Sequence, residues 1–263
     1  MPWALPDSER ELLRLAKSYP FDAPAASYLF RDGAAAPLPA APLPADALPA
    51  DAAASDLFAG RTPVIAHGSN RAPAQLRRKF GDSAEIPVSH AWLGDHDVVY
   101  SAHLTRYGSV AANLHHVPGA RVEVFVTWLT EAQLARMHET ELGSEIYAYG
   151  VMERIDLRLE AGPAGHIGEA HVYISTRGCL PEAGAPLGLA AVAAEGRPHG
   201  ALDQDGALAL VRDRHRPDHA LDDFILTVIR DAGHRKALIA EMGEAAVPTA
   251  VPHFRVLRGP GRS

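Results

Sequence analysis

Cysteine is almost absent from this sequence: Cys179 is the single example among 263 residues. One thiol cannot form an intramolecular disulfide, and it cannot supply the several thiolates of a cysteine-rich zinc site. Nothing in the flanking run Thr-Arg-Gly-Cys-Leu marks this thiol as a nucleophile. We therefore expect Cys179 to be a small buried residue.

Long apolar runs and an excess of positive charge are also missing. No stretch of about 18 apolar residues occurs, so no transmembrane helix is expected. The first residues lack the basic start of a secretory signal and residues 8–18 are highly charged, which predicts a soluble cytoplasmic protein. The 25 Lys and Arg face 32 Asp and Glu, a formal charge of -7. Because phosphate backbones attract positive charge, we expect no nucleic-acid partner.

Apolar residues make up 47% of the chain and charged residues 22%, as in globular proteins. The patterning predicts three parts. Residues 1–60 form an arm, with a helix over 8–18 that its first serine caps and an Ala/Pro-rich linker or strap over 33–54. Residues 61–178 form the body, and residues 179–263 form a helical extension packed on it.

Periodicity predicts a mixture of strands and helices, and hence an α+β chain. The expected strands cover residues 64–66, 97–104, 121–128, 147–159 and 169–175. The expected helices or helical turns cover residues 72–80, 130 to 141–143, 186–196, 203–214, 218–232 with Asp218 as its cap, and 234–244.

A glycine-containing loop, His67-Gly68-Ser69-Asn70, joins the strand at 64–66 to the helix at 72–80. A strand, a tight loop and a helix start gather backbone N–H groups in one place, which suits a carboxylate or phosphate ligand. The run matches neither the P-loop nor the dinucleotide-binding fingerprint. Spacing alone leaves two interpretations open: an ordinary turn with Asn70 as the helix cap, or a ligand site.

Two carboxylates, Glu139 and Glu141, end the predicted helix that begins at Thr130 with a capping box. The negative end of a helix dipole disfavours an ionised carboxylate, and so does burial. Both effects raise the pKa of a carboxyl group toward the range that suits general acid–base catalysis. A solvated helix end with unfavourably placed acids is the alternative interpretation.

Clusters of histidine and of basic residues offer weaker signals. Fourteen histidines include His103, the run Asp95-His96-Asp97, and the pair His115 and His116. Adjacent residues of a strand point to opposite faces, so that pair cannot face one metal ion from a strand. No HExxH-type spacing occurs, and we expect no metal site. The run Arg77-Arg78-Lys79 is expected to be a solvated helix face.

The loop and the glutamate, in this order, resemble the gamma-glutamyl cyclotransferase-like family. That family has a Tyr-Gly-Ser-Asn loop followed by a helix with Leu-Arg-Arg, matched here by His67 to Asn70 and by Leu76-Arg77-Arg78. A segment ending in Pro-Gly and a Leu-Thr-Glu-x-x-Leu helix follow, as in Pro118-Gly119 and in residues 129–134. The family's catalytic glutamate falls on Glu141, and the resemblance covers about residues 62–155, extending toward 175.

Three positions depart from the family pattern. The loop tyrosine is His67, the aspartate of the helix end is His138, and the glycine after the glutamate is Leu142. A histidine in the loop alters the pocket lining and introduces a group that titrates near neutral pH. A leucine in place of the glycine at position 142 changes how the backbone positions the Glu141 side chain. The resemblance therefore does not determine the exact substrate, and it determines the activity less firmly than an unaltered pattern would.

The resemblance implies a mixed β-barrel with flanking helices and an enzyme that cyclises a gamma-glutamyl group to 5-oxoproline, releasing an amine or amino acid. Glu141 is then the general acid and base. The substrate-binding residues it implies are His67, Gly68, Ser69, Asn70 and Tyr147. The partner is a small molecule with a carboxylate, no metal or organic cofactor takes part, and a homodimer is possible.

Two other functions remain open. The same pocket with Glu141 activating water would make an amidohydrolase. Alternatively the fold is kept as a non-catalytic ligand-binding or interaction module. An enzyme requires Glu141 to face a cavity beside residues 68–70, whereas a solvent-facing Glu141 removes the site.

Overall fold

The computed structural model describes residues 4–38, 57–144 and 146–260, so most of the predicted strap at 33–54 lies outside the described residues. The chain folds into two compact units, each assembled from three separated stretches. The first unit comprises Met1–Phe21, Asp95–Val122 and Ile174–Val251. The second unit comprises Asp22–Gly94, Glu123–Tyr173 and Pro252–Ser263. The division of the chain into an arm, a body and an extension stays a prediction.

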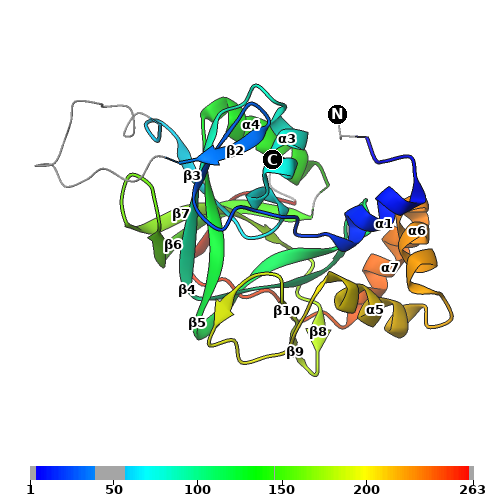
Figure 1. Cartoon of the computed structure of the whole chain (residues 1–263). Coiled ribbons are helices and arrows are strands. Elements are labelled where there is room, and N and C mark those ends of the chain that lie inside the picture. The colour runs from blue at the N-terminus through cyan, green and yellow to red at the C-terminus, as the bar shows by residue number, and fades with distance from the viewer. Residues whose placement is uncertain (1–3, 39–56, 145, 261–263) are drawn as a thin grey trace, which may run out of the picture. The chain divides into compact units, whose positions relative to one another are not determined.

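Five mixed strands form a closed barrel (Figure 1). β3 (Thr62–Ala66) pairs antiparallel with β5 (Val110–Leu129) and parallel with β7 (His166–Ser175). β6 (Tyr147–Leu159) lies beside β7 and pairs antiparallel with β4 (Ile86–Leu104), which pairs in turn with β5 and closes the ring. The predicted α+β class with a mixed β-barrel is therefore confirmed. β4 and β5 are longer than predicted.

Local sequence explains where α3 and α4 of the second unit begin. α3 (Pro73–Phe80) starts with a proline. Proline has no N–H group, and the first residue of a helix has no intrahelical acceptor for one, so no hydrogen bond is lost. α4 (Glu131–Glu141) has the predicted capping box: Thr130 Oγ1 accepts from the Gln133 N–H at 3.3 Å, and Gln133 Oε1 accepts from the Thr130 N–H at 3.0 Å. Both helices form as predicted, and α4 continues into a short 3-10 turn, η2 (Leu142–Ser144).

α3 and α4 lie side by side against one apolar cluster of the second unit (Figure 1). Leu76 of α3 and Met137 of α4 are both buried in this cluster, which Phe125 of β5 and Tyr149 of β6 share. Burial of such side chains stabilises the fold by about 1.5–3 kcal/mol each. The packing holds the end of α3 beside the end of α4.

Three further strands extend the sheet of the second unit. β1 (Tyr28–Arg31) pairs antiparallel with β4 and with β2 (Ala34–Pro37). β2 is an exposed, extended edge strand at the start of the linker or strap predicted over residues 33–54. β13 (Phe254–Arg258), which the sequence analysis did not predict, pairs antiparallel with β6.

Gly150 allows β13 to approach β6 closely, and Gly150→Ala is expected to lower the free energy of unfolding. A Cβ at this position would overlap the carbonyl oxygen of Arg255 and the ring of Phe254. Overpacking of this kind costs about 1–3 kcal/mol. Urea denaturation measures the effect, and Gly168→Ala in β7, where a Cβ has room, is the matched control. Equal stability of the two variants would contradict the close approach.

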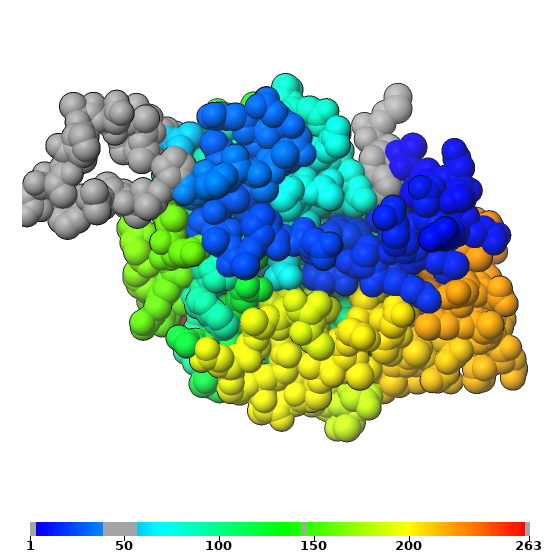
Figure 2. All heavy atoms as spheres, in the orientation of Figure 1, coloured from blue at the N-terminus to red at the C-terminus, as the bar shows by residue number. Residues whose placement is uncertain are grey.

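The first unit contains α1 (Glu9–Lys17), α5 (Gln204–His215), α6 (Leu221–Arg230) and α7 (Ala232–Glu244). α6 contacts each of the other three. Figure 2 shows α1, in dark blue, against the orange atoms of α6. Ser8 caps α1 as predicted. No helix in the described parts of the chain is both long enough and apolar enough to span a membrane.

Two predictions for the first unit are wrong. The N-cap of α6 is Ala220, which offers no side-chain hydrogen bond, and not Asp218. Residues 186–196 form no helix despite their alanines, because their backbone groups form hydrogen bonds with neighbouring strands instead. The short strands of this region are β8 (Pro181–Glu182), β9 (Ala185–Pro186), β10 (Gly188–Leu189), β11 (Ala194–Glu195) and β12 (Ala201–Leu202).

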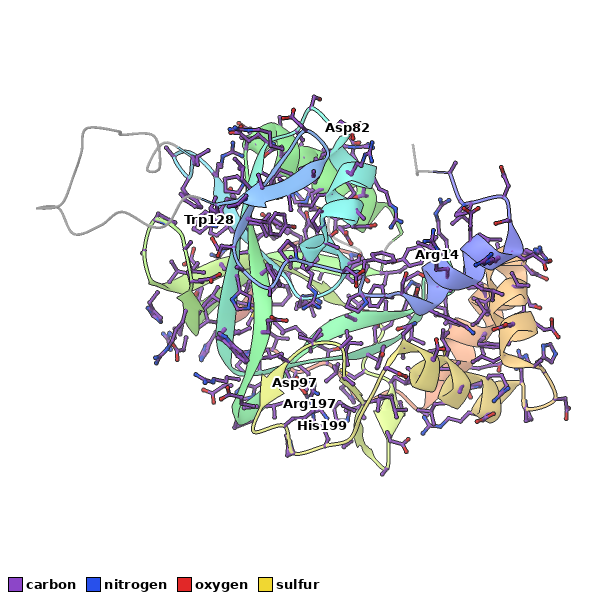
Figure 3. All side chains as sticks on the ribbon, viewed as in Figure 1. Arg14, Asp82, Asp97, Trp128, Arg197 and His199 are labelled. Atoms are coloured by element: carbon purple, nitrogen blue, oxygen red, sulfur yellow. The ribbon has the colours of Figure 1, made fainter. Side chains whose placement is uncertain are left out.

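A buried ion pair holds this strand-rich segment in place within the first unit. Asp97 of β4 is fully buried and accepts from Arg197 Nε at 2.6 Å and from Nη2 at 2.8 Å. His199 Nε2 lies 3.4 Å from Asp97 Oδ2, and the three labelled side chains lie together in Figure 3. Arg197 also donates to the carbonyl of Val192 at 3.4 Å. One arginine thus ties residues 189–199 to β4.

Candidate active site

Glu141 and the loop after β3 are in direct contact in the second unit. Glu141 is the last residue of α4, and its side chain is 14% exposed. Asn70 Nδ2 donates a hydrogen bond to Glu141 Oε1 at 3.0 Å. The structure therefore brings together a helix-end carboxylate and a glycine loop that are separated by about 70 residues in the sequence.

Lys79 is the second partner of Glu141. Its ammonium forms an ion pair with Glu141 Oε1, and its Nζ lies 3.4 Å from Met137 Sδ. The Lys79 side chain is 6% exposed. The expectation that residues 77–79 are a solvated face is therefore wrong for Lys79, whereas Arg77 is exposed and pairs with Asp82.

Helical spacing contained a signal for the burial of Lys79. Gln75, Leu76 and Lys79 are the buried residues of α3. Lys79 lies four positions after Gln75 and three positions after Leu76, so its side chain is on their face of the helix. The sequence analysis treated Lys79 as part of a basic run and did not place it on the face of Leu76.

Because of the ion pair, the pKa of Glu141 is shifted in the direction opposite to the prediction. Burial acts to raise the pKa of this carboxyl, but the Lys79 ammonium, the hydrogen bonds from Lys79 and Asn70, and the charge of His67 act against it. The net result is a pKa below the usual range for glutamate. The prediction of a raised pKa is therefore wrong in the resting protein, where Glu141 is ionised at neutral pH.

The loop itself forms a single 3-10 turn, η1 (Ser69–Arg71), preceded by Gly68. The N–H of Arg71 donates to the carbonyl of Gly68 at 3.3 Å. In the described chain, the N–H groups of Gly68, Ser69 and Asn70 donate to no backbone carbonyl outside their own element. The N-cap of α3 is Ala72, so the interpretation of Asn70 as the helix cap is wrong.

Asn70 carries an unsatisfied acceptor. Its Oδ1 is buried and has no hydrogen-bond partner among the residues that the structure describes. Because buried polar atoms are nearly always hydrogen-bonded, a ligand donor or an ordered water fits this position. The same side chain thus touches Glu141 with its amide nitrogen and offers its oxygen to a ligand.

The other two predicted binding residues lie in the same unit. His67 is buried at the end of β3, and its charge lowers the pKa of Glu141. Tyr147 is half-buried at the start of β6 and packs against the apolar cluster. Of the predicted site residues, Asn70 and Glu141 are joined by the hydrogen bond given above.

A layer of aromatic and histidine side chains lies beside His138 of α4. His138, one turn before Glu141, has its Nδ1 at 2.7 Å from the Tyr173 hydroxyl and its ring edge-on to Tyr149. The Tyr149 hydroxyl lies 2.7 Å from His171 Nδ1. Burial raises the pKa of Tyr149 to about 12 and lowers that of His138. These groups are therefore neutral at physiological pH.

Among the described residues, no three His, Cys, Asp or Glu side chains gather closely enough to hold a metal ion. Cys179 is buried in the first unit, with its Sγ 3.5 Å from His115 Nδ1, and burial raises the pKa of its thiol to about 11. Cys179 is thus the small buried residue that its sequence context predicts.

Comparison with known proteins shows only weak structural similarity. No protein-family model matches the chain, and no curated protein matches it. A solved structure of an uncharacterized protein from Homo sapiens aligns with 18% identity over 44% of this chain and 68% of its own, at a TM-score of 0.34. A solved gamma-glutamyl cyclotransferase aligns with 13% identity over 69% of this chain and 99% of its own, also at a TM-score of 0.34. The chemistry of this chain is therefore inferred from the side chains around Glu141.

Proposed function

We propose that this protein is a gamma-glutamyl cyclotransferase-like enzyme, with Glu141 as its general acid and base. The observation that carries the proposal is the position of Glu141, ionised and largely buried between Asn70 and Lys79. A carboxylate sequestered from water beside unused hydrogen-bonding groups suits proton transfer on a small bound molecule.

The loop offers complementary groups for the two charged ends of such a substrate. The buried Oδ1 of Asn70 can accept a hydrogen bond from the α-ammonium group, which Glu141 also attracts. The N–H groups of Gly68, Ser69 and Asn70 can donate to the α-carboxylate or to the oxyanion that develops on the γ-carbonyl. The ammonium of Lys79 adds positive charge on the same side.

The reaction requires one base that later acts as an acid. Glu141 removes a proton from the substrate's α-ammonium group, and the free amine attacks the γ-carbonyl carbon to close a five-membered ring. The attacking nitrogen then gives up a second proton, and the C–N bond to the leaving amine breaks as Glu141 passes both protons in turn to the leaving nitrogen, which departs as an ammonium ion. The products are 5-oxoproline and the released amine or amino acid, with no net change in protons or electrons.

A ligand-binding module is the second candidate, and the Lys79–Glu141 ion pair favours it. A carboxylate whose pKa lies below its usual range is a weak base. The enzymatic proposal therefore requires the substrate to compete with Lys79 for Glu141, so that the carboxylate's proton affinity rises in the complex. A module that only binds a zwitterionic ligand makes no such demand.

Glu141→Gln is expected to reduce 5-oxoproline formation by at least about a hundredfold, because general acid–base groups contribute roughly a hundred- to ten-thousandfold. The measurement is product release from a panel of gamma-glutamyl dipeptides and gamma-glutamyl amines, followed by mass spectrometry. Glu139→Gln is the matched control: it lies on the same helix, is exposed, and pairs with Arg136.

Each outcome of the panel assigns the site differently. Product that disappears in Glu141→Gln and persists in Glu139→Gln supports the cyclotransferase. Amide cleavage without 5-oxoproline would assign the same residues to an amidohydrolase. If the folded wild-type protein turns over no compound but binds one by calorimetry, and Glu141→Gln abolishes that binding, the ligand-binding module replaces the enzyme.

A further inference from the structure

The turn that joins β4 to β5 brings several segments of the first unit together. The N–H of Thr105 donates to the carbonyl of Ser109 at 2.8 Å, which closes the turn. Gly108 packs so closely on Ile229 that a Cβ there would overlap it. The C-terminal end of α6 therefore lies against the turn.

Two more segments meet the same place from other parts of the sequence. The N–H of Ala102 donates to the carbonyl of Gly178 at 3.1 Å, so the segment after β7 runs beside the end of β4. Arg235 of α7 donates from Nη1 to the carbonyl of Val228 at 2.6 Å, so its guanidinium lies at the end of α6. The turn, the segment after β7 and the start of α7 are thus neighbours.

Each of these segments contributes a basic side chain. They are His103 at the end of β4, Arg106 in the turn, Arg177 after β7 and Arg235 in α7. The charges interact: Arg177 and Arg235 act on His103, and Arg106 acts on Arg235. In the described chain, no carboxylate forms an ion pair with Arg177 or Arg235 within 4.0 Å; Asp231 acts on Arg235 and caps α7 by accepting from the His234 N–H at 2.8 Å.

His103 is an unsatisfied polar group inside this basic cluster. The residue is 8% exposed, and its Nδ1 has no hydrogen-bond partner among the described residues. Burial and the two arginines lower the pKa of His103 to about 4, so the ring is neutral at physiological pH. A buried imidazole nitrogen without a partner, surrounded by cations, is what an anion would satisfy by bringing negative charge and hydrogen bonds.

We propose that His103, Arg177 and Arg235 form a binding site for a phosphoryl group, in the first unit and independent of Glu141. Phosphate carries three strong acceptor oxygens that match the several N–H donors of two guanidinium groups. The whole chain is acidic, with a formal charge of -7, so this gathering of positive charge is a local feature and not a general attraction for anions.

Isothermal titration calorimetry of the full chain with inorganic phosphate, in a phosphate-free buffer of low ionic strength, tests the site. Wild-type protein is expected to bind one phosphate, and Arg177→Gln is expected to weaken binding by about tenfold or more, because charge-assisted hydrogen bonds are the strong ones. Arg177 is exposed and its variant leaves the hydrogen bonds of α6 intact. Arg14→Gln, an exposed arginine of α1, is the control with the same change of charge.

A second readout links the binding to His103. The ring resonances of His103 in a proton NMR spectrum are expected to shift on addition of phosphate to the wild type, and to shift less in Arg177→Gln. A phosphate monoester, glycerol 3-phosphate, distinguishes the source of the phosphoryl group: tighter binding than inorganic phosphate assigns an organic phosphate, and equal binding assigns the free anion. Absence of heat and of a His103 shift with both probes, or equal weakening in Arg14→Gln, would overturn the proposal.

Discussion

Lys79→Met is expected to lower the free energy of unfolding by about 3–5 kcal/mol at neutral pH, which is the usual cost of removing one partner of a buried ion pair. The substitution leaves the Glu141 carboxylate largely buried with Asn70 as its remaining hydrogen-bond donor. Methionine preserves most of the apolar volume of the lysine stem, so the loss arises from the charge and not from a cavity. Urea denaturation followed by circular dichroism measures it.

The pH dependence of this loss follows from the Glu141 pKa. In the wild type the folded pKa lies below the unfolded value, so the carboxylate's contribution is present above the unfolded pKa and is lost as the pH falls through the folded pKa. In Lys79→Met, burial is opposed only by the weaker effects of Asn70 and His67, and the folded pKa of Glu141 rises. The stability difference between wild type and variant is therefore expected to narrow as the pH is lowered.

Two further variants separate the ion pair from other effects. Arg77→Met removes an exposed cation from the same helix and is expected to leave the denaturation midpoint nearly unchanged. The double variant Lys79→Met with Glu141→Gln leaves no unpaired charge, and it is expected to be more stable than Lys79→Met alone. If Lys79→Met behaves like Arg77→Met at every pH, the ion pair with Glu141 does not exist in solution.

Asp97→Asn is expected to lower the free energy of unfolding of the first unit by about 3–5 kcal/mol. Asp97 is fully buried and the Arg197 side chain is 14% exposed. The variant therefore leaves the guanidinium group of Arg197 largely buried without its negatively charged partner. Because Arg197 also donates to the Val192 carbonyl, the loss should spread through residues 189–199. Hydrogen exchange is expected to report faster opening there, in addition to the shift in denaturation.

The exposed ion pair of the same segment provides the control for Asp97→Asn. Glu195 of β11 pairs with Arg121 at 2.6 Å, and both side chains are more than half exposed. Glu195→Gln is expected to leave both the denaturation midpoint and the hydrogen exchange of residues 189–199 nearly unchanged, because solvent screens such pairs. Equal effects of the two substitutions would show that the Asp97–Arg197 pair does not hold the segment.

The sequence determined the elements whose signals are local. The capping box at Thr130, the cap at Ser8 and the proline at the start of α3 each fixed a helix boundary through bonds within one turn. The apolar run at 64–66 and the periodic pattern of α6 followed from burial of one face. These features depend on neighbouring residues, and they agree with the structure.

Pairing over long distances decided what the sequence analysis missed. Residues 186–196 have the composition of a helix, but β10 finds partners in β4 and β12, and β11 finds a partner in β5. Backbone hydrogen bonds to another strand outweigh a helix propensity of a few tenths of a kcal/mol per residue. β13 was missed for the same reason, since its partner β6 lies about 100 residues away in the sequence.

The candidate site shows the same division. Sequence spacing placed Glu141 at a helix end and Asn70 in a loop after a strand, and the resemblance to the gamma-glutamyl cyclotransferase-like family gave both residues a role in the site. Only the packing of α3 against α4 brought Lys79 onto Glu141 and lowered the pKa that the helix end and burial alone would raise. The charge state of a buried group depends on which charges the fold brings near it, and a linear sequence does not contain that distance.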